Sequence, residues 1–197
     1  MKTIFTFMFT LLLPCIVWAK GDVIGYVTKV EGGAYTVDGT QLRKGAEIFQ
    51  EDLITTSSNG KVLVRLLEGT ELTVGSNSTI SLEDFKLEED KQILNVLKGA
   101  YLYVTGKGKK QTSQREIKTE FATVGIRGTT VWGGMLETTC EIFVVEGEVS
   151  VKSDGGEVIL KPGEGTATAS MSMAPTPAKK WPEKKVKRAV ATVTFAE

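Results

Sequence analysis

The sequence predicts an all-β fold built from short strands. Runs of alternating apolar and polar residues recur along the chain, and glycine-bearing turns separate them, which is typical of half-buried strands. The clearest runs cover residues 62–66, 71–74, 79–82 and 101–104. The chain has 197 residues, enough for one domain with a sizeable core.

A weak internal repeat indicates how these strands are organised. Residues 27–45 contain V-T-K-V-E-G, a valine strand, an Asp-Gly turn and Gly45, and residues 144–163 repeat this order with V-V-E-G and end at Gly163. A third partial copy covers residues 94–104. Recurring strand-glycine-strand units favour a short β-solenoid or roll, and a β-sandwich with similar hairpins is the alternative.

One segment is ambiguous between helix and hairpin. Leu82, Phe85, Ile93 and Leu97 fall near helical spacing, and helix-forming residues lie between them. The same residues also fit a hairpin that turns at residues 89–91, because β-branched and aromatic residues flank the turn. We expect the hairpin, since it continues the repeat.

The first 19 residues resemble a secretory signal peptide. Lys2 supplies a positive start, residues 4–17 are mostly apolar, and Val17-Trp18-Ala19 places small residues at −3 and −1 of a cleavage site. We therefore expect a mature chain that begins at Lys20 and is periplasmic, secreted or on the cell surface. A retained membrane anchor and a lipid-modified Cys15 are the alternatives.

The cysteine content bears on disulfide bonds, and the distribution of charge bears on the kind of partner. Cys140 is the one cysteine after the signal segment, so no disulfide within the mature chain is expected and the core must hold the fold. Residues 20–178 carry 17 basic and 22 acidic residues. A mildly acidic body argues against nucleic acid as the partner.

The composition also excludes common enzyme chemistries. The chain has no histidine, which removes Ser-His-Asp and Cys-His catalysis and His-ligated zinc sites. Adjacent carboxylates such as Glu51-Asp52 and Glu83-Asp84 point to opposite faces of a strand and are poor acid/base pairs. We expect no enzyme activity, no catalytic residues, no metal site and no cofactor.

The most distinctive stretch is T-V-G-I-R-G-T at residues 123–129. Two glycines allow a turn with positive φ, and Arg127 between them carries a guanidinium that cannot stay buried without partners. We expect Arg127 to lock the fold by bridging carbonyls or a carboxylate such as Asp52, and partner contact is the alternative role. The candidate residues of this motif are Gly125, Arg127, Gly128 and Thr129.

This motif resembles the core motif of the FecR domain, which reads roughly T-x-x-A-x-V-x-V-R-G-T. Residues 27–32 with 42–45, residues 52–56 and residues 67–72 are similar to three further blocks of that family, in the same order. The resemblance therefore covers about residues 22–163. The chain departs from the family pattern at Glu51, where glycine is frequent, and at Glu120, where proline is frequent.

Resemblance to FecR implies a role in signalling, since the namesake relays transport status from an outer-membrane receptor to an extracytoplasmic sigma factor. That mechanism needs a cytoplasmic segment, and here only Met1-Lys2 precede the apolar run. We therefore expect an exported module that binds a protein or envelope glycan without direct sigma-factor control. A structural envelope module that binds peptidoglycan or polysaccharide is the alternative.

The C-terminal region differs in composition from the body. Residues 20–165 are expected to form the FecR-like domain, residues 166–182 a low-complexity linker, and residues 183–197 a basic tail with a last strand at 189–195. An aromatic residue among positive charges suits peripheral contact with an anionic membrane surface. The candidate contacts are Lys179, Lys180, Trp181, Lys184, Lys185, Lys187 and Arg188.

Overall fold

A computed structural model describes residues 21–86, 91–106 and 114–196. These residues form fifteen strands and one helix, α1, at Glu183–Ala191. The strands are β1 Val23–Glu31, β2 Ala34–Tyr35, β3 Glu47–Phe49, β4 Leu53–Thr56, β5 Lys61–Leu66, β6 Glu71–Val74, β7 Thr79–Ser81, β8 Lys91–Lys98, β9 Tyr101–Val104, β10 Gln114–Thr119, β11 Thr123–Leu136, β12 Thr139–Ser153, β13 Gly156–Leu160, β14 Glu164–Thr168 and β15 Lys179–Lys180. The all-β prediction is confirmed.

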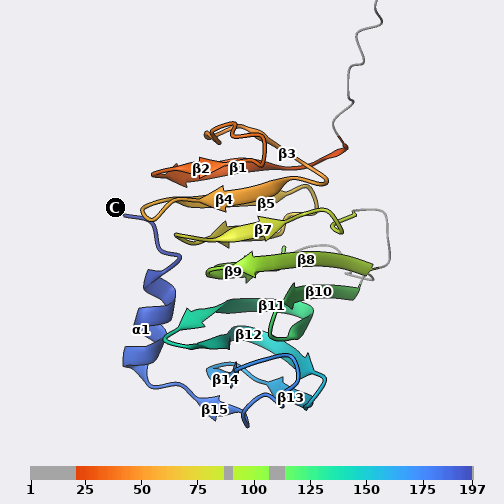
Figure 1. Ribbon diagram of the computed structural model, residues 1–197, viewed down its shortest axis with the longest axis vertical. Coiled ribbons are helices and arrows are strands. Elements are labelled where there is room, and N and C mark those ends of the chain that lie inside the picture. The colour runs from red at the N-terminus through yellow and green to blue at the C-terminus, as the bar shows by residue number, and fades with distance from the viewer. Residues whose placement is uncertain (1–20, 87–90, 107–113, 197) are drawn as a thin grey trace, which may run out of the picture.

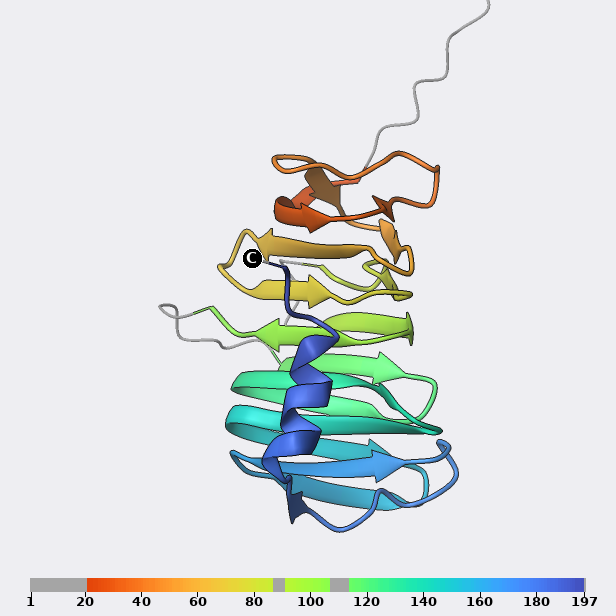
Figure 2. The same cartoon turned by 90° about the vertical axis from the view of Figure 1, so that its left-hand side faces the viewer.

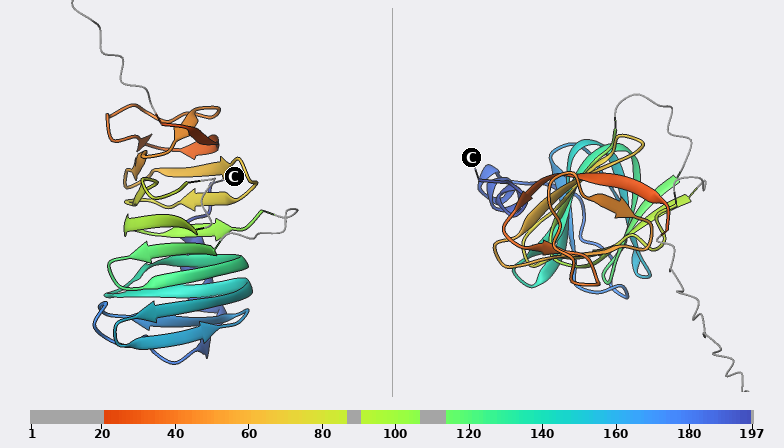
Figure 3. Two further views of the ribbon diagram at one scale, coloured as in Figure 1. Left: turned by 90° about the vertical axis from the view of Figure 1, so that its right-hand side faces the viewer. Right: turned by 90° about the horizontal axis from the view of Figure 1, so that it is seen from above.

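All fifteen strands belong to one sheet that curls round on itself (Figures 1 and 3). One wall runs β2-β4-β7-β8-β10 and the other runs β3-β1-β5-β6-β9. The long strand β11 joins them, because its first residues pair with β10 and its later residues pair with β9. Strand β12 continues both walls in the same way, pairing with β14 and then with β13.

The finer expectation of a solenoid or roll is not confirmed. Within the described sheet, neighbouring strands are antiparallel except for β8 and β10, which are parallel. Figure 1 shows the strands stacked from β1 at one end to β15 at the other.

The internal repeat corresponds to matching turns at opposite ends of the stack. The Gly45 amide donates to the Val27 carbonyl over 2.8 Å, and the Gly163 amide donates to the Val144 carbonyl over 2.8 Å. Both glycines have positive φ, 88° and 80°. Gly99, in the third partial copy, also has a positive φ of 91°. The repeated glycines are therefore residues at which the chain turns in a conformation that favours glycine.

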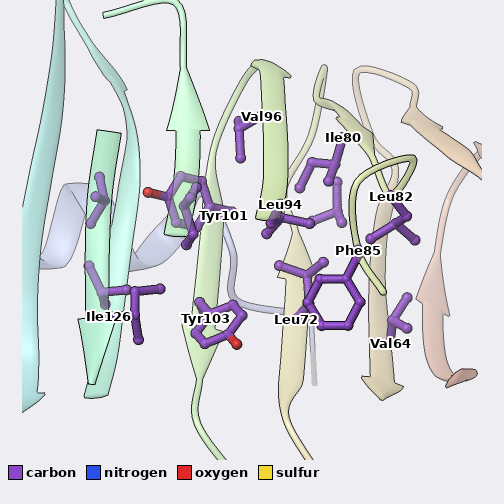
Figure 4. Close-up of a cluster of buried hydrophobic side chains, with 14 of the residues drawn as sticks. Val64, Leu72, Ile80, Leu82, Phe85, Leu94, Val96, Tyr101, Tyr103 and Ile126 are labelled. Carbon is purple, nitrogen blue, oxygen red and sulfur yellow. The ribbon is translucent and has the colours of Figure 1, made fainter. Parts of the chain in front are cut away.

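The core lies between the two walls. Alternate residues of β4, β5 and β9 are buried, as the period of two requires. Figure 4 shows part of this core, in which side chains of β5 to β9 and of β11 meet. The buried residues labelled there include Val64, Leu72, Ile80, Leu94, Tyr101, Tyr103 and Ile126.

The hairpin between β7 and β8 confirms the choice made for the ambiguous segment. Ile80 pairs with Val96 in an antiparallel register. Leu82 and Phe85 are buried, and the Phe85 amide donates to the Leu82 carbonyl over 3.0 Å, as in a turn. Residues 89 and 90 of the expected turn lie outside the described residues.

The expected strand at residues 189–195 is wrong, because α1 covers residues 183–191. Pro182 stands just before the helix. Lysine, arginine and glutamate, which are good helix formers, make up much of it. Val186, Ala189 and Val193 recur at helical spacing and pack on the outer surface of the sheet. The segment expected to be a strand is therefore the last turn of the helix, through Ala191, and the turn that follows it.

The expected linker at residues 166–182 is also wrong, since it is fixed to the sheet at both ends. Thr166 and Thr168 belong to β14 and are buried, and β15 pairs with β14. Between them the Thr176 amide donates to the Ala167 carbonyl over 2.9 Å. Hydroxyl groups add further bonds: the Thr166 Oγ1 donates to the Thr176 carbonyl over 2.5 Å, and the Thr176 Oγ1 accepts from the Ala167 amide over 2.9 Å, so this low-complexity stretch is held to the sheet.

After β15 the chain runs back along the outside of the stack (Figure 2). It starts beside β14 and ends near β1, where the Ala196 amide donates to the Glu31 carboxylate over 2.7 Å. That hydrogen bond is the main cause that lowers the pKa of Glu31. Residues 181–196 are here called the C-terminal strap.

Candidate binding site

Residues 125–129 form a corner at which both long strands bend from one wall to the other. The pairing of β11 with β12 shifts register between Arg127 and Thr130, which is a β-bulge. Gly128 has a φ of 64° and Gly147, opposite on β12, has a φ of 86°. A Cβ at Gly147 would lie 2.7 Å from the Gly128 carbonyl oxygen, so only glycine fits.

Two more residues of the motif hold this corner in place. A Cβ at Gly125 would approach the Ser150 Oγ to 2.7 Å, so a larger residue there would require the Ser150 hydroxyl to move. Thr129 is buried, its amide donates to the Thr105 Oγ1 over 3.0 Å, and its carbonyl accepts from the Thr105 amide over 2.9 Å. The structure therefore gives packing or backbone roles to three residues of the motif, Gly125, Gly128 and Thr129.

Arg127 differs from its neighbours, because its side chain is exposed. Its guanidinium forms no hydrogen bond or ion pair with any residue that the structure describes. Glu148 is the residue opposite Arg127 in the strand register. Asp52, the expected partner, accepts a hydrogen bond from the Phe49 amide over 2.8 Å. The expectation that Arg127 locks the fold is thus wrong: the bulge turns its side chain out to solvent.

The locking arginine is Arg115 on β10, which the sequence reasoning missed. It is 5% exposed and lies within the interior. Its Nε donates to the Gln92 Oε1 over 2.9 Å, and its Nη1 donates to the Thr70 Oγ1 over 2.9 Å and to the Tyr103 hydroxyl over 3.3 Å. Its Nη2 lies 3.6 Å from the Glu68 carboxylate. The sequence held a signal for this burial, because Arg115 and the apolar Ile117 are two residues apart and so point to the same face of a strand.

The aromatic residue of the predicted basic tail is an anchor for the strap. The Trp181 ring stacks on Phe143 with centroids 4.8 Å apart and meets Trp132 edge-on at 5.9 Å. The Lys185 ammonium lies 4.2 Å from the centre of the Trp181 ring and 2.5 Å from a Glu141 carboxylate oxygen. The Trp181 ring therefore packs against the sheet and does not point toward a membrane surface.

Half of the predicted tail cations are paired within the chain. Besides Lys185, Lys187 lies 2.6 Å from Glu183, and Arg188 lies 3.2 Å from Glu137. Lys179, Lys180 and Lys184 are exposed and have no carboxylate partner among the described residues, although Lys180 donates to the Pro162 carbonyl. Three cations thus remain available to an anionic surface.

Within residues 21–86, 91–106 and 114–196, no group of three or more Cys, Asp or Glu side chains is placed to hold a metal ion. No helix in this part of the chain is long and apolar enough to cross a membrane.

The fold and the corner together define an all-β domain whose most distinctive motif shapes a bend in its sheet and leaves one arginine exposed. Residues 52–150 match the family model described as FecR protein. The chain belongs to the FecR protein family. No curated protein matches the chain.

Two solved structures share this fold. Both are crystal structures described as "a putative anti-sigma factor from Parabacteroides distasonis ATCC 8503", at 2.50 Å and 1.65 Å resolution. The TM-scores are 0.58 and 0.57, and each structure is 15% identical to this chain. The similarity covers 68% of this chain and 62% of each of those chains, so it spans less than two thirds of the relatives' length.

Proposed function

We infer that this chain is an exported, non-enzymatic FecR-domain module that acts in signalling by binding a protein partner outside the cytoplasm. Membership of the FecR family supports the signalling role. The alternative role, a structural module that binds envelope glycan, has no comparable observation in its favour.

One observation carries the proposal: the Arg127 side chain is exposed at the corner, and its guanidinium forms no hydrogen bond or ion pair with the described residues. A planar guanidinium with five donors suits bidentate recognition of a partner's carboxylate. The glycines that fix the corner hold the Arg127 backbone in place, so less conformational freedom is lost on binding. Val145, two residues before Gly147 on β12, is 47% exposed.

Site-specific photo-cross-linking in the producing cells tests this proposal. A photoreactive residue at position 148, which lies opposite Arg127 in the strand register and leaves its guanidinium in place, should give an adduct of higher mass that depends on illumination. Position 65 is the matched control, because Arg65 is also exposed on a strand but is ion-paired with Glu71. No adduct at 148, or equal adducts at 148 and 65, would count against a partner at the corner.

A peripheral contact with an anionic membrane leaflet is a second role, favoured by the three exposed lysines without carboxylate partners. Each basic residue near such a surface contributes about 1 kcal/mol before screening by salt. Replacing Lys179, Lys180 and Lys184 by alanine should reduce sedimentation with anionic vesicles at low salt. Sedimentation that is unchanged by these substitutions or by added salt would exclude this contact.

A further inference from the structure

A groove of about 530 Å³ lies at the β1 end of the stack (Figure 1). Two stretches of the chain line it. One is residues 28–30 with Gly32, from β1 and the turn after it, and the other is residues 41–44, which lead into the turn at Gly45. Its volume is within the range of about 300–1,000 Å³ that is usual for ligand sites.

Three of the residues that line the groove are cations, and none of them is an acid. The cations are Lys29, Arg43 and Lys44, and all three are exposed. None of them forms an ion pair with a described carboxylate. The Lys29 ammonium lies 4.7 Å from the centre of the Phe195 ring, a contact that leaves its charge in place. The groove therefore favours an anion over a cation or a neutral molecule.

Glu31 is the acid nearest to Lys29 in the sequence, and its carboxylate already has two partners. The Lys61 ammonium donates to it over 3.1 Å, and the Ala196 amide donates to it over 2.7 Å. Glu31 does not line the groove. It therefore leaves room beside Lys29 for a carboxylate from another molecule.

The turn at Gly45 also has main-chain donors without partners. The amides of Arg43 and Lys44 donate to no described residue. The next two amides are both used: the Gly45 amide donates to the Val27 carbonyl over 2.8 Å, and the Ala46 amide donates to the Arg43 carbonyl over 2.9 Å. Amide donors beside cationic side chains suit an anionic acceptor, because hydrogen bonds to a charged group are the stronger ones.

The matching turn at Gly163, at the other end of the internal repeat, shows which acceptor fits. There the Glu164 amide donates to the Lys161 carbonyl over 2.9 Å, as the Ala46 amide does to the Arg43 carbonyl. The Lys161 amide, which is equivalent to the Arg43 amide, donates to the Glu164 Oε2 over 2.9 Å. The turn at Gly163 thus binds a glutamate of its own chain, whereas the turn at Gly45 has Ala46 at that position, whose side chain offers no acceptor.

We propose that this groove binds an acidic segment of a partner protein, with one carboxylate accepting from the Arg43 amide and others lying beside the three cations. A glutamate side chain is the group that the turn at Gly163 holds in the same geometry. Three cations without ion-pair partners favour a segment with several acids over a single carboxylate. None of residues 125–129 lines the groove, so this proposal stands or fails separately from a partner at Arg127.

Titration of the full chain with acetylated tetraglutamate amide at low salt, followed by NMR, tests the proposal. The tetraglutamine peptide is the matched probe, because it has nearly the same size and lacks the charges. We expect shifts at residues 28–32 and 41–46, binding that weakens as salt is added, and a Kd at least about tenfold higher for the glutamine peptide. Arg43→Ala combined with Lys44→Ala should weaken binding about tenfold, as the loss of two surface ion pairs would give. Lys161→Ala, at the equivalent position of the other turn, is the matched control and should change nothing.

Ala46→Glu is a sharper variant, because it gives the turn at Gly45 the carboxylate that the turn at Gly163 already has. It should abolish binding of the glutamate peptide while the Tm stays close to that of the natural chain. If this variant does not fold, the double alanine variant decides.

Four results would overturn the proposal: no binding of the glutamate peptide, equal binding of both peptides, shifts confined to basic residues outside the groove, or unchanged binding in the double alanine variant. Trigalacturonate tests a saccharide as the source of the carboxylates. Tighter binding of this sugar acid than of the glutamate peptide would also overturn the proposal, in favour of an acidic glycan.

Discussion

At the scale of single residues, two arginines of neighbouring strands have opposite roles. Arg115 points inward from β10 and is enclosed by Gln92, Thr70 and Tyr103, whereas Arg127 points outward from β11. A buried guanidinium holds polar groups that would otherwise lack partners, while an exposed one stabilises the fold very little. Stability and binding are therefore separable by mutation.

Arg115→Ala should destabilise the protein strongly, because it leaves the buried Glu68 carboxylate and the Thr70 hydroxyl without the guanidinium. The expected loss is about 3–5 kcal/mol, which lowers the Tm by on the order of 10 °C for a domain of this size. Arg127→Ala is the matched control and should change the Tm by little. Thermal unfolding followed by circular dichroism measures both, and a larger loss for Arg127→Ala would reverse the assignment.

Cys140 gives a prediction about pH. Burial raises the pKa of its thiol from about 9 to about 11. The thiol is neutral in both the folded and unfolded protein below pH 9, and between pH 9 and 11 only the unfolded protein releases the proton. The free energy of unfolding should therefore fall over that range, by about 3 kcal/mol from this group.

Urea unfolding at pH 8 and at pH 10.5 measures this effect of the thiol, with Cys140→Ala as the control that should lose less stability over the same interval. Alkylation of Cys140 by iodoacetamide should be slow at pH 8 in the folded protein and fast in urea. Rapid alkylation of the folded protein at pH 8 would contradict a buried, neutral thiol.

At the scale of elements, the C-terminal strap explains why parts of β11 and β12 are buried on both faces. Residues 131–134 and 140–144 are buried without alternation, which a sheet with one wet face would not show. Trp132 and Phe143 face outward and are covered by Trp181, Val186 and Ala189. The strap thus closes a second apolar cluster outside the main core.

Trp181→Ala should remove the ring that packs on Phe143 and Trp132. The expected loss is about 3 kcal/mol of unfolding free energy, at the lower end for a large aromatic because Trp181 is only partly buried. Lys184→Ala is the control on the same strap, since Lys184 is exposed, and it should fall within about 0.5 kcal/mol of the natural chain. Urea unfolding distinguishes the two, and equal stabilities would mean that the strap is not anchored by this ring.

The sequence predicted the elements whose signal is local. The alternating runs and the repeated glycines gave the strands and turns, and Glu51 confirms the value of the family comparison: it has a φ of 75° where glycine is frequent in the family. The helix was missed because the apolar residues at 189–195 alternate like a short strand, and the surface that α1 packs on cannot be read from the sequence. The Arg115 cluster was missed because its members lie up to 47 residues apart in the sequence, from Glu68 to Arg115.

At the scale of the whole molecule, the curled sheet has four strand edges that must be protected from pairing with other chains. Strands β2 and β3 at one end and β15 at the other have only two or three residues each. Beside β13, the Asp154 amide donates to the Met171 carbonyl over 2.8 Å, so the segment after β14 covers that end. The short edge strands and this covering segment leave little edge backbone with which another chain could pair.

The expected export of the chain is tested by finding where the mature protein begins. The charged start, apolar run and small residues before Lys20 predict removal of residues 1–19. Mass spectrometry of the protein isolated from the envelope of the producing cells should show an N-terminus at Lys20 or within a few residues. An intact Met1 in the membrane fraction would mean that the segment is retained as an anchor.

The central claim is that Arg127 serves a partner and not the fold, and one measurement tests it directly. A photoreactive residue at Val145, on the same corner, is placed in the natural chain and in Arg127→Glu. We expect an adduct in the natural background, its loss in Arg127→Glu, and closely similar Tm values for the two proteins. An adduct of equal yield in both backgrounds would contradict the claim, and so would a marked fall of the Tm in Arg127→Glu.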